Sequence, residues 1–152
     1  MRFRSLSDRE IKSLLEECWH GVLALVDGDR PYCFPTAHVF CRGSLYFLFL
    51  RYGRKIRCIE RNPNACYLVL NMSSHSWFSI VVEGVLTRVD SAAEVREVLE
   101  MFASRVFPRD PYFSELVEVP GITARLLEEH MSGRIPGVYR MSLSNISGIA
   151  YP

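Results

Sequence analysis

Uninterrupted apolar runs occupy the middle of the chain, and stripes of helical periodicity flank them. The run from Leu45 to Leu50 consists of six large apolar residues, which is typical of a strand buried on both faces. Residues 77–89 predict a long strand, in which Gly84 marks a bulge or a barrel corner. Further strands are predicted at 21–26, 31–40, 65–70 and 137–144.

Helical periodicity follows two sequences that resemble capping boxes, Ser7-x-x-Glu10 and Ser91-x-x-Glu94. They predict an N-terminal helix at 7–18 and a helical insertion at 91–133. Because short turns join most of the six predicted strands, these strands should be mostly antiparallel. The pattern favours a single domain, 1–152, with a mainly β fold: a small closed or partly split barrel from about residue 20, with flanking helices.

Composition narrows the classes of partner. A net charge of +1 gives no overall attraction to nucleic acid or anionic lipid, so neither partner is expected. No apolar run reaches membrane-spanning length, and the N-terminus lacks the apolar core of a signal peptide. The five cysteines contain no CxxC pair, which indicates reduced thiols and a cytoplasmic protein. The four histidines lack metal-ligand spacing, so no metal site is predicted.

Cations gather at the turn that follows the buried strand at 45–50. Gly53 allows the chain to turn into a short segment of helical periodicity. At the start of such a helix, free backbone N–H groups and the positive dipole end lie beside Arg54 and Lys55. These groups together predict a site for a phosphorylated ligand. The following cations, Arg57 and Arg61, are equally consistent with a solvated helix face.

Short motifs follow one another along the chain in a characteristic order. They are Pro31-Tyr32-Cys33-Phe34-Pro35, Leu45-Tyr46-Phe47 followed by Gly53-Arg54-Lys55, Arg61-Asn62-Pro63, the strand from Trp77 to Gly84, Val138-Tyr139-Arg140 and Ser147-Gly148. In this order and spacing they resemble the FMN-binding split barrels related to pyridoxamine 5′-phosphate oxidase, especially the nitroimidazole-resistance branch. The resemblance extends from about Gly21 to the C-terminus.

This resemblance implies a six-stranded antiparallel split β-barrel that forms a homodimer, with FMN in grooves at the subunit interface. It assigns the FMN phosphate to Arg54 and Lys55, the pair that the turn already singles out. It implies that the strand carrying Pro35, Thr36 and His38 runs along the isoalloxazine ring. Two residues of the long strand are expected near the same ring, namely Ser79 and Trp77.

The chain departs from that branch directly after Tyr46-Phe47. The branch commonly has a histidine and a hydroxyl residue there, whereas this chain has Leu48, Phe49 and Leu50. Losing a hydrogen bond to a charged group costs about 1.5–3 kcal/mol, or about one to two decades in affinity. Apolar residues at 48 and 49 are instead suited to pack against the dimethylbenzene edge of a flavin. FMN is the cofactor expected, with a deazaflavin or haem as alternatives.

The function implied is that of a flavin-dependent oxidoreductase, which reduces or oxidises a small planar substrate while the protein positions the ring and limits solvent. No catalytic residue is identified, and such a barrel requires no protein acid or base. The apolar Leu48 and Phe49 support a second hypothesis, a non-catalytic protein that carries or stores flavin or haem.

Overall fold

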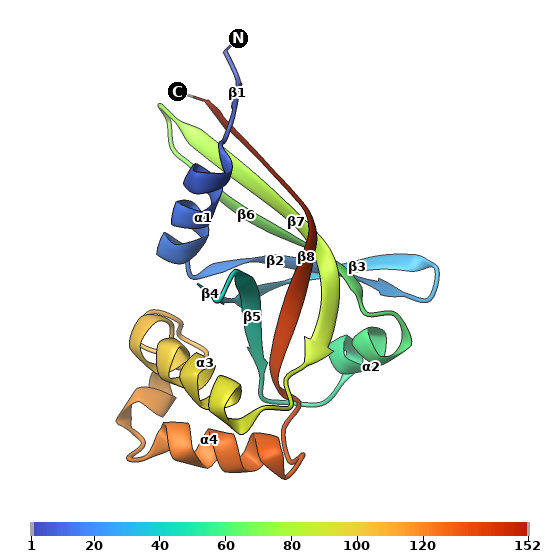
Figure 1. Ribbon diagram of the computed structural model, residues 1–152, viewed down its shortest axis with the longest axis vertical. Coiled ribbons are helices and arrows are strands. Elements are labelled where there is room, and N and C mark those ends of the chain that lie inside the picture. The colour runs from blue at the N-terminus through green and yellow to red at the C-terminus, as the bar shows by residue number, and fades with distance from the viewer. Residues whose placement is uncertain (1, 152) are drawn as a thin grey trace.

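The computed structural model describes residues 2–151, which form a long curled sheet with helices packed around it (Figure 1). In chain order the elements are β1 (Arg4–Ser5), α1 (Asp8–Glu17), β2 (His20–Asp27), β3 (Arg30–Ala37), β4 (Val39–Cys41), β5 (Ser44–Phe49), α2 (Arg54–Arg61), β6 (Asn64–Met72), β7 (Trp77–Arg88), α3 (Ala92–Arg105), the 3₁₀ helix η1 (Ser114–Glu118), α4 (Ile122–Met131) and β8 (Gly137–Tyr151).

All strand pairs are antiparallel, and the sheet follows the order β3-β2-β6-β7-β8-β5-β4, with β1 beside β8. The edge strands β3 and β4 are separated in the chain by His38 alone, so the sheet curls until its edges approach each other. The predicted mainly β split barrel with flanking helices is confirmed. The sheet has eight strands rather than six, because β1 is added and the predicted strand 31–40 is divided at His38.

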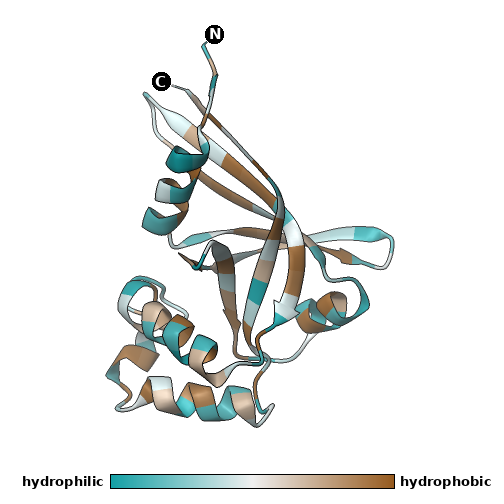
Figure 2. Cartoon of the chain, viewed as in Figure 1, coloured by the Kyte–Doolittle hydropathy of each residue, from teal (hydrophilic) through white to brown (hydrophobic). Residues whose placement is uncertain are grey.

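The apolar run at 45–50 forms β5, and this strand is buried on both faces as predicted. Leu45, Phe47 and Phe49 point into the barrel core, which also receives residues from α1 and α2. Tyr46 and Leu48 point the other way, into a second core that α3 and α4 cover. Figure 2 shows hydrophobic positions concentrated along β5 and the inner strands, while α1 presents hydrophilic positions in this view.

The bulge predicted at Gly84 is confirmed by a register shift between Glu83 and Gly84 in the pairing of β7 with β8. A Cβ atom on Gly84 would overlap the carbonyl group of Ser142, so the two backbones can approach this closely only because the residue is glycine. Beyond the bulge β8 continues to pair with β7 as far as Tyr151, so this last strand is longer than the predicted 137–144.

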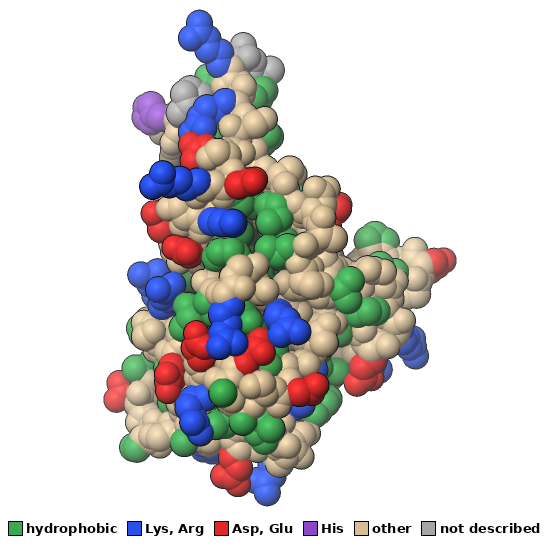
Figure 3. Space-filling model, viewed as in Figure 1, with side chains coloured by type: hydrophobic (Ala, Val, Ile, Leu, Met, Phe, Trp, Pro, Cys, Tyr) green, Lys and Arg blue, Asp and Glu red, His purple; other side chains and the backbone are tan. Residues whose placement is uncertain are grey.

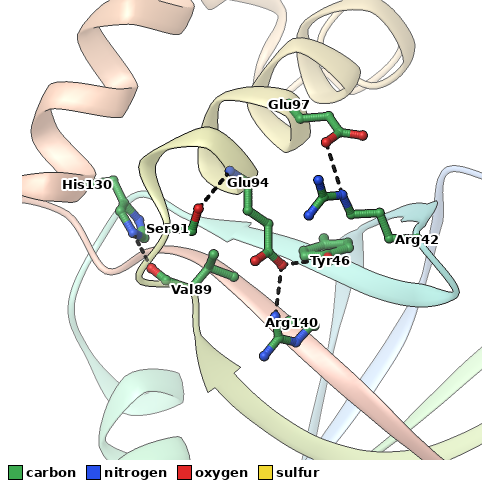
Figure 4. A network of polar contacts seen from close by, with 8 residues as sticks. All are labelled: Arg42, Tyr46, Val89, Ser91, Glu94, Glu97, His130 and Arg140. Atoms are coloured by element: carbon green, nitrogen blue, oxygen red, sulfur yellow. Dashed lines mark hydrogen bonds and ion pairs between the residues drawn. The ribbon is translucent and has the colours of Figure 1, made fainter.

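A polar network fastens the helical layer to the sheet (Figure 4). Glu94 of α3 accepts hydrogen bonds from the Tyr46 hydroxyl at 2.7 Å and from Arg140 at 2.9 Å. Burial opposes the ionisation of Glu94, but these hydrogen bonds outweigh it and lower the pKa of the carboxyl group. The Val138 N–H also donates to Nδ1 of the buried His130 at 3.1 Å. These contacts hold α3 and α4 against β5 and β8, beside the cavity at the end of β5.

Candidate functional site

A cavity of about 500 Å³ opens where β5 ends and α2 begins. Its walls come from β3, the end of β5, the segment 50–53, the start of α2, the start of β2 and the loop that follows α3. The volume falls within the range of small-molecule sites, about 300–1,000 Å³. The cavity therefore lies at the strand-to-helix turn that the sequence singles out.

Lys55 supplies a half-buried cation to this cavity. Its ammonium nitrogen lies 4.5 Å from the ring centroid of Phe34 and 5.8 Å from that of Phe49. Within residues 2–151, no carboxylate forms an ion pair with it, and burial lowers the pKa of the side chain. Because a partly desolvated cation is stabilised by a bound anion, Lys55 favours an anionic ligand.

The start of α2 adds further donors to the same corner. Arg54 and Lys55 are its first two residues, and the first N–H groups of an α-helix have no acceptor within the helix. Arg54 donates from Nε to Asp27 Oδ2 at 2.8 Å, and its guanidinium carbon lies 3.9 Å from the ring centroid of Tyr32. The geometry of this corner suits a phosphoryl group, which can accept from both cations and from backbone N–H groups.

The wall beside the cationic corner is apolar. Leu48 and Phe49 both line the cavity, and both are almost fully buried. Leu48 belongs to the core beneath α3 and α4, whereas Phe49 belongs to the barrel core. The cavity thus touches both cores at the end of β5, and this wall offers van der Waals contact rather than side-chain hydrogen bonds.

Strand β3 forms another wall of the cavity, to which Pro35 and Thr36 contribute. His38 lies behind this wall, where it is buried and both ring nitrogens have partners within the protein. Its Nε2 donates to the Leu15 carbonyl oxygen at 3.0 Å, and its Nδ1 lies 2.7 Å from the Tyr67 hydroxyl. The Tyr67 hydroxyl also lies 3.1 Å from the Thr36 carbonyl oxygen, so this cluster supports the wall from the barrel side.

The structure brings six of the nine predicted site residues together around this cavity, namely Arg54, Lys55, Pro35, Thr36, Leu48 and Phe49. His38 stands behind the wall, and the other two lie in β7. Trp77 lines a separate cavity of about 580 Å³ beside α1 and the end of β8. Ser79 follows on the same strand, on the sheet face that turns away from the barrel core.

Several cavity residues were not predicted as site residues from the sequence. Trp19 and His20 lie at the start of β2, and Asp110 and Tyr112 lie in the loop after α3, more than fifty residues beyond Lys55 in the chain. No local motif marks them, because only tertiary folding brings them to this rim. Trp19 and His20 arrive with the curled sheet, and Asp110 and Tyr112 arrive with the helical layer that packs against β5. Tyr32 lies within one of the family motifs, but its contact with Arg54 depends on the curl of the sheet.

Charged and metal-ligating side chains also lie outside the cavity. On the face shown in Figure 3, Lys and Arg side chains alternate with Asp and Glu. No cluster of three or more His, Cys, Asp or Glu side chains among residues 2–151 has the arrangement of a metal site. The helices described for these residues are all too short or too polar to cross a membrane.

Comparison with protein families gives a match over nearly the whole chain. The model of a family described as pyridoxamine 5′-phosphate oxidase matches residues 7–149, which include every wall of the cavity. A comparison with curated proteins found no match.

Solved structures of similar fold include proteins described as flavin-binding. An FAD-binding protein from Mesorhizobium loti has a TM-score of 0.70 and 21% identity, with 100% of each chain covered. The FAD-binding protein from Mycobacterium smegmatis has a TM-score of 0.67 and 15% identity, covering 98% of this chain and 100% of that one. A candidate 5-nitroimidazole antibiotic resistance protein from Bacteroides thetaiotaomicron has a TM-score of 0.66 and 16% identity, covering 99% and 89%. At these identities the likeness shows a shared fold.

Proposed function

The chain belongs to the pyridoxamine 5′-phosphate oxidase family, and from that premise we propose that it binds a flavin in the cavity at the start of α2. The observation that carries this proposal is that Lys55, a half-buried cation at a helix N-terminus, forms no ion pair with a carboxylate among residues 2–151. An anionic phosphoryl group bound there would supply a negative counter-charge for Lys55 and accept hydrogen bonds from the free N–H groups.

The cavity residues fit a flavin in two respects. Arg54 and Lys55 match one phosphoryl group, which is the reason that we propose FMN rather than a larger dinucleotide. The apolar wall of Leu48 and Phe49 matches the hydrocarbon edge of the ring system. The description of two structural relatives as FAD-binding supports the choice of a flavin over the alternatives, a deazaflavin or haem.

We propose that the chemistry is oxidation or reduction of a small planar substrate. The bound flavin would supply hydride or electron transfer. Two tyrosines at the rim, Tyr52 and Tyr112, are each more than half exposed and offer flat faces to such a substrate. The Tyr52 hydroxyl donates to the Gly133 carbonyl oxygen at 2.7 Å, which restrains this ring before a substrate binds.

A carrier function is the second candidate, and the apolar side chains of Leu48 and Phe49 favour it. They leave this stretch of the wall without side-chain donors that would adjust the reactivity of the ring. Turnover separates the two functions: an oxidoreductase accelerates donor-dependent reduction of a planar acceptor above the rate with free FMN, whereas a carrier binds FMN without such acceleration.

We also propose a homodimer, because one face of the sheet is apolar and exposed. Residues paired across β2, β6 and β7 place Val22, Leu68 and Val81 in one row on the face opposite the barrel core. On the same face Leu70 and Ile149 are each more than 40% exposed. Pro35, which lines the cavity, pairs with Val22 and continues this face to the cavity edge. A partner subunit on this face would therefore border the ligand.

The direct test is to identify the small molecule that copurifies with the protein, or to add FMN to protein without one. We expect a visible flavin spectrum with the mass of FMN after release. FAD, a deazaflavin or haem would each be recognised by its own mass and spectrum and would replace FMN in the proposal. Protein that remains colourless and does not perturb added FMN would remove it altogether.

A further inference from the structure

The β2–β3 hairpin lies beside α2, although the two are well separated in the sequence (Figure 1). Asp27 ends β2, and its Oδ2 accepts the Nε–H of Arg54 at 2.8 Å. Tyr32 of β3 lies beneath the same guanidinium group, with its ring centroid 3.9 Å from the central carbon. One contact engages an edge of the guanidinium plane and the other covers a face, so together they restrict its orientation.

The contacts of Arg54 with Asp27 and Tyr32 are expected to add little to the stability of the fold. The side chains of Arg54 and Asp27 are 52% and 34% exposed, and ion pairs at such positions contribute little to folding. These contacts are better suited to favour ligand binding, because an arginine already held in place loses less conformational freedom when a ligand binds. With Nε engaged by Asp27, the two Nη groups are the donors left for a ligand.

We propose that Asp27 and Tyr32 are positioning residues, which hold Arg54 so that its Nη groups meet a phosphoryl group at the start of α2. The cavity would thereby prefer a phosphorylated ligand over the same ligand without phosphate. This inference rests on the proposed function, since it requires the phosphoryl group to lie beside Arg54 and Lys55. The charge of Asp27 by itself repels a phosphate, so its benefit comes through the orientation of Arg54.

The test compares FMN with riboflavin, which has the same ring system and no phosphate, in titrations followed by flavin fluorescence. We expect Asp27→Ala to weaken FMN binding about tenfold and to leave riboflavin binding unchanged. Asp27→Asn retains an oxygen acceptor for Arg54 Nε, so its FMN affinity should stay within about threefold of the wild type. Tyr32→Leu should weaken FMN binding by about threefold to tenfold, whereas Tyr32→Phe, which keeps the ring, should not.

Asp29→Ala is the matched control, because Asp29 lies in the same hairpin turn and forms no ion pair within the described residues. Positioning by Asp27 would be overturned if Asp27→Ala bound FMN as tightly as the wild type, or if it lost FMN and riboflavin affinity equally. Equal gains in FMN affinity for Asp27→Ala and Asp27→Asn would also overturn positioning by Asp27, because repulsion between the Asp27 charge and the phosphate would then explain both gains.

These results separate the two proposals. A wild-type protein that binds FMN no more tightly than riboflavin would overturn both the phosphoryl site and the positioning of Arg54, because the phosphate would then contribute nothing to binding. A strong preference for FMN that Lys55→Ala abolishes, but Asp27→Ala and Tyr32→Leu leave unchanged, would overturn the positioning alone.

Discussion

Two adjacent cations acquire different surroundings at the start of α2. Arg54 faces the carboxylate of Asp27, whereas Lys55 faces the rings of Phe34 and Phe49. Burial lowers the pKa of Lys55, because removing water from an ammonium group without supplying a counter-ion disfavours its charge. An anion bound at this point reverses that penalty, so Lys55 has most to gain from a phosphorylated ligand.

We therefore expect Lys55→Ala to lower FMN affinity by about ten- to a hundredfold, since one charge-assisted hydrogen bond is lost. Isothermal titration with FMN and riboflavin measures this, and riboflavin affinity should change little. Arg57→Ala is the matched control, because Arg57 is an exposed cation of the same helix that does not line the cavity. FMN binding by Lys55→Ala at wild-type strength would place the phosphate elsewhere.

Buried histidine makes the stability of the protein depend on pH. Burial lowers the pKa of His38 from 6.5 to about 4, so the unfolded chain binds a proton that the folded chain does not between these values. The stabilisation is fully present above pH 6.5 and is lost as the pH falls toward 4. The loss is about 3 kcal/mol, at about 1.4 kcal/mol per pKa unit. Burial also lowers the pKa of His130, which adds to the same trend.

Urea unfolding at a series of pH values measures this dependence. We expect the free energy of unfolding to fall between pH 7 and pH 4.5, and His38→Asn to fall less steeply because its own contribution is gone. His75→Asn serves as the control, since His75 lies exposed in the turn between β6 and β7. Identical slopes for His38→Asn and the wild type would show that His38 does not titrate as we infer.

At Gly84 the backbones of β7 and β8 approach each other too closely for a side chain. Gly84→Ala would place a Cβ atom against the Ser142 carbonyl group and disturb the bulge between β7 and β8. We expect a loss of about 1–3 kcal/mol in the free energy of unfolding, measured by urea denaturation. Thr87→Ala, an exposed position of the same strand, should be nearly neutral, and an equally neutral Gly84→Ala would argue against a close approach.

The exposed sheet face is the surface on which we propose that two chains assemble. Leu70 lies on that face and is 44% exposed, so Leu70→Lys should leave the monomer folded while adding a charge to the proposed interface. By sedimentation we expect the wild type at twice the chain mass of 17.5 kDa and the variant at the chain mass. Val117→Lys changes an apolar residue of similar exposure, 46%, within the helical layer and should remain dimeric. A wild-type monomer at micromolar concentration would contradict the proposal.

Features that depend only on neighbouring residues could be predicted before the fold was known. The uninterrupted apolar run at 45–50 predicted a strand buried on both faces. The predicted capping box of Ser7 and Glu10 forms at the start of α1. Gly84 marked the bulge, and Gly53-Arg54-Lys55 marked the start of a helix with two cations. Each of these is encoded by local periodicity, backbone freedom or charge, which is why it could be predicted without the fold.

The surroundings of those two cations, in contrast, depend on how the chain folds. Asp27 and Tyr32 reach Arg54 because the sheet curls the β2–β3 hairpin over α2, and Asp110 and Tyr112 reach the cavity because the helical layer packs against β5. Burial of His38 behind the wall likewise follows from the approach of the two sheet edges. Such contacts join segments far apart in the chain, and no local pattern encodes which of them will meet.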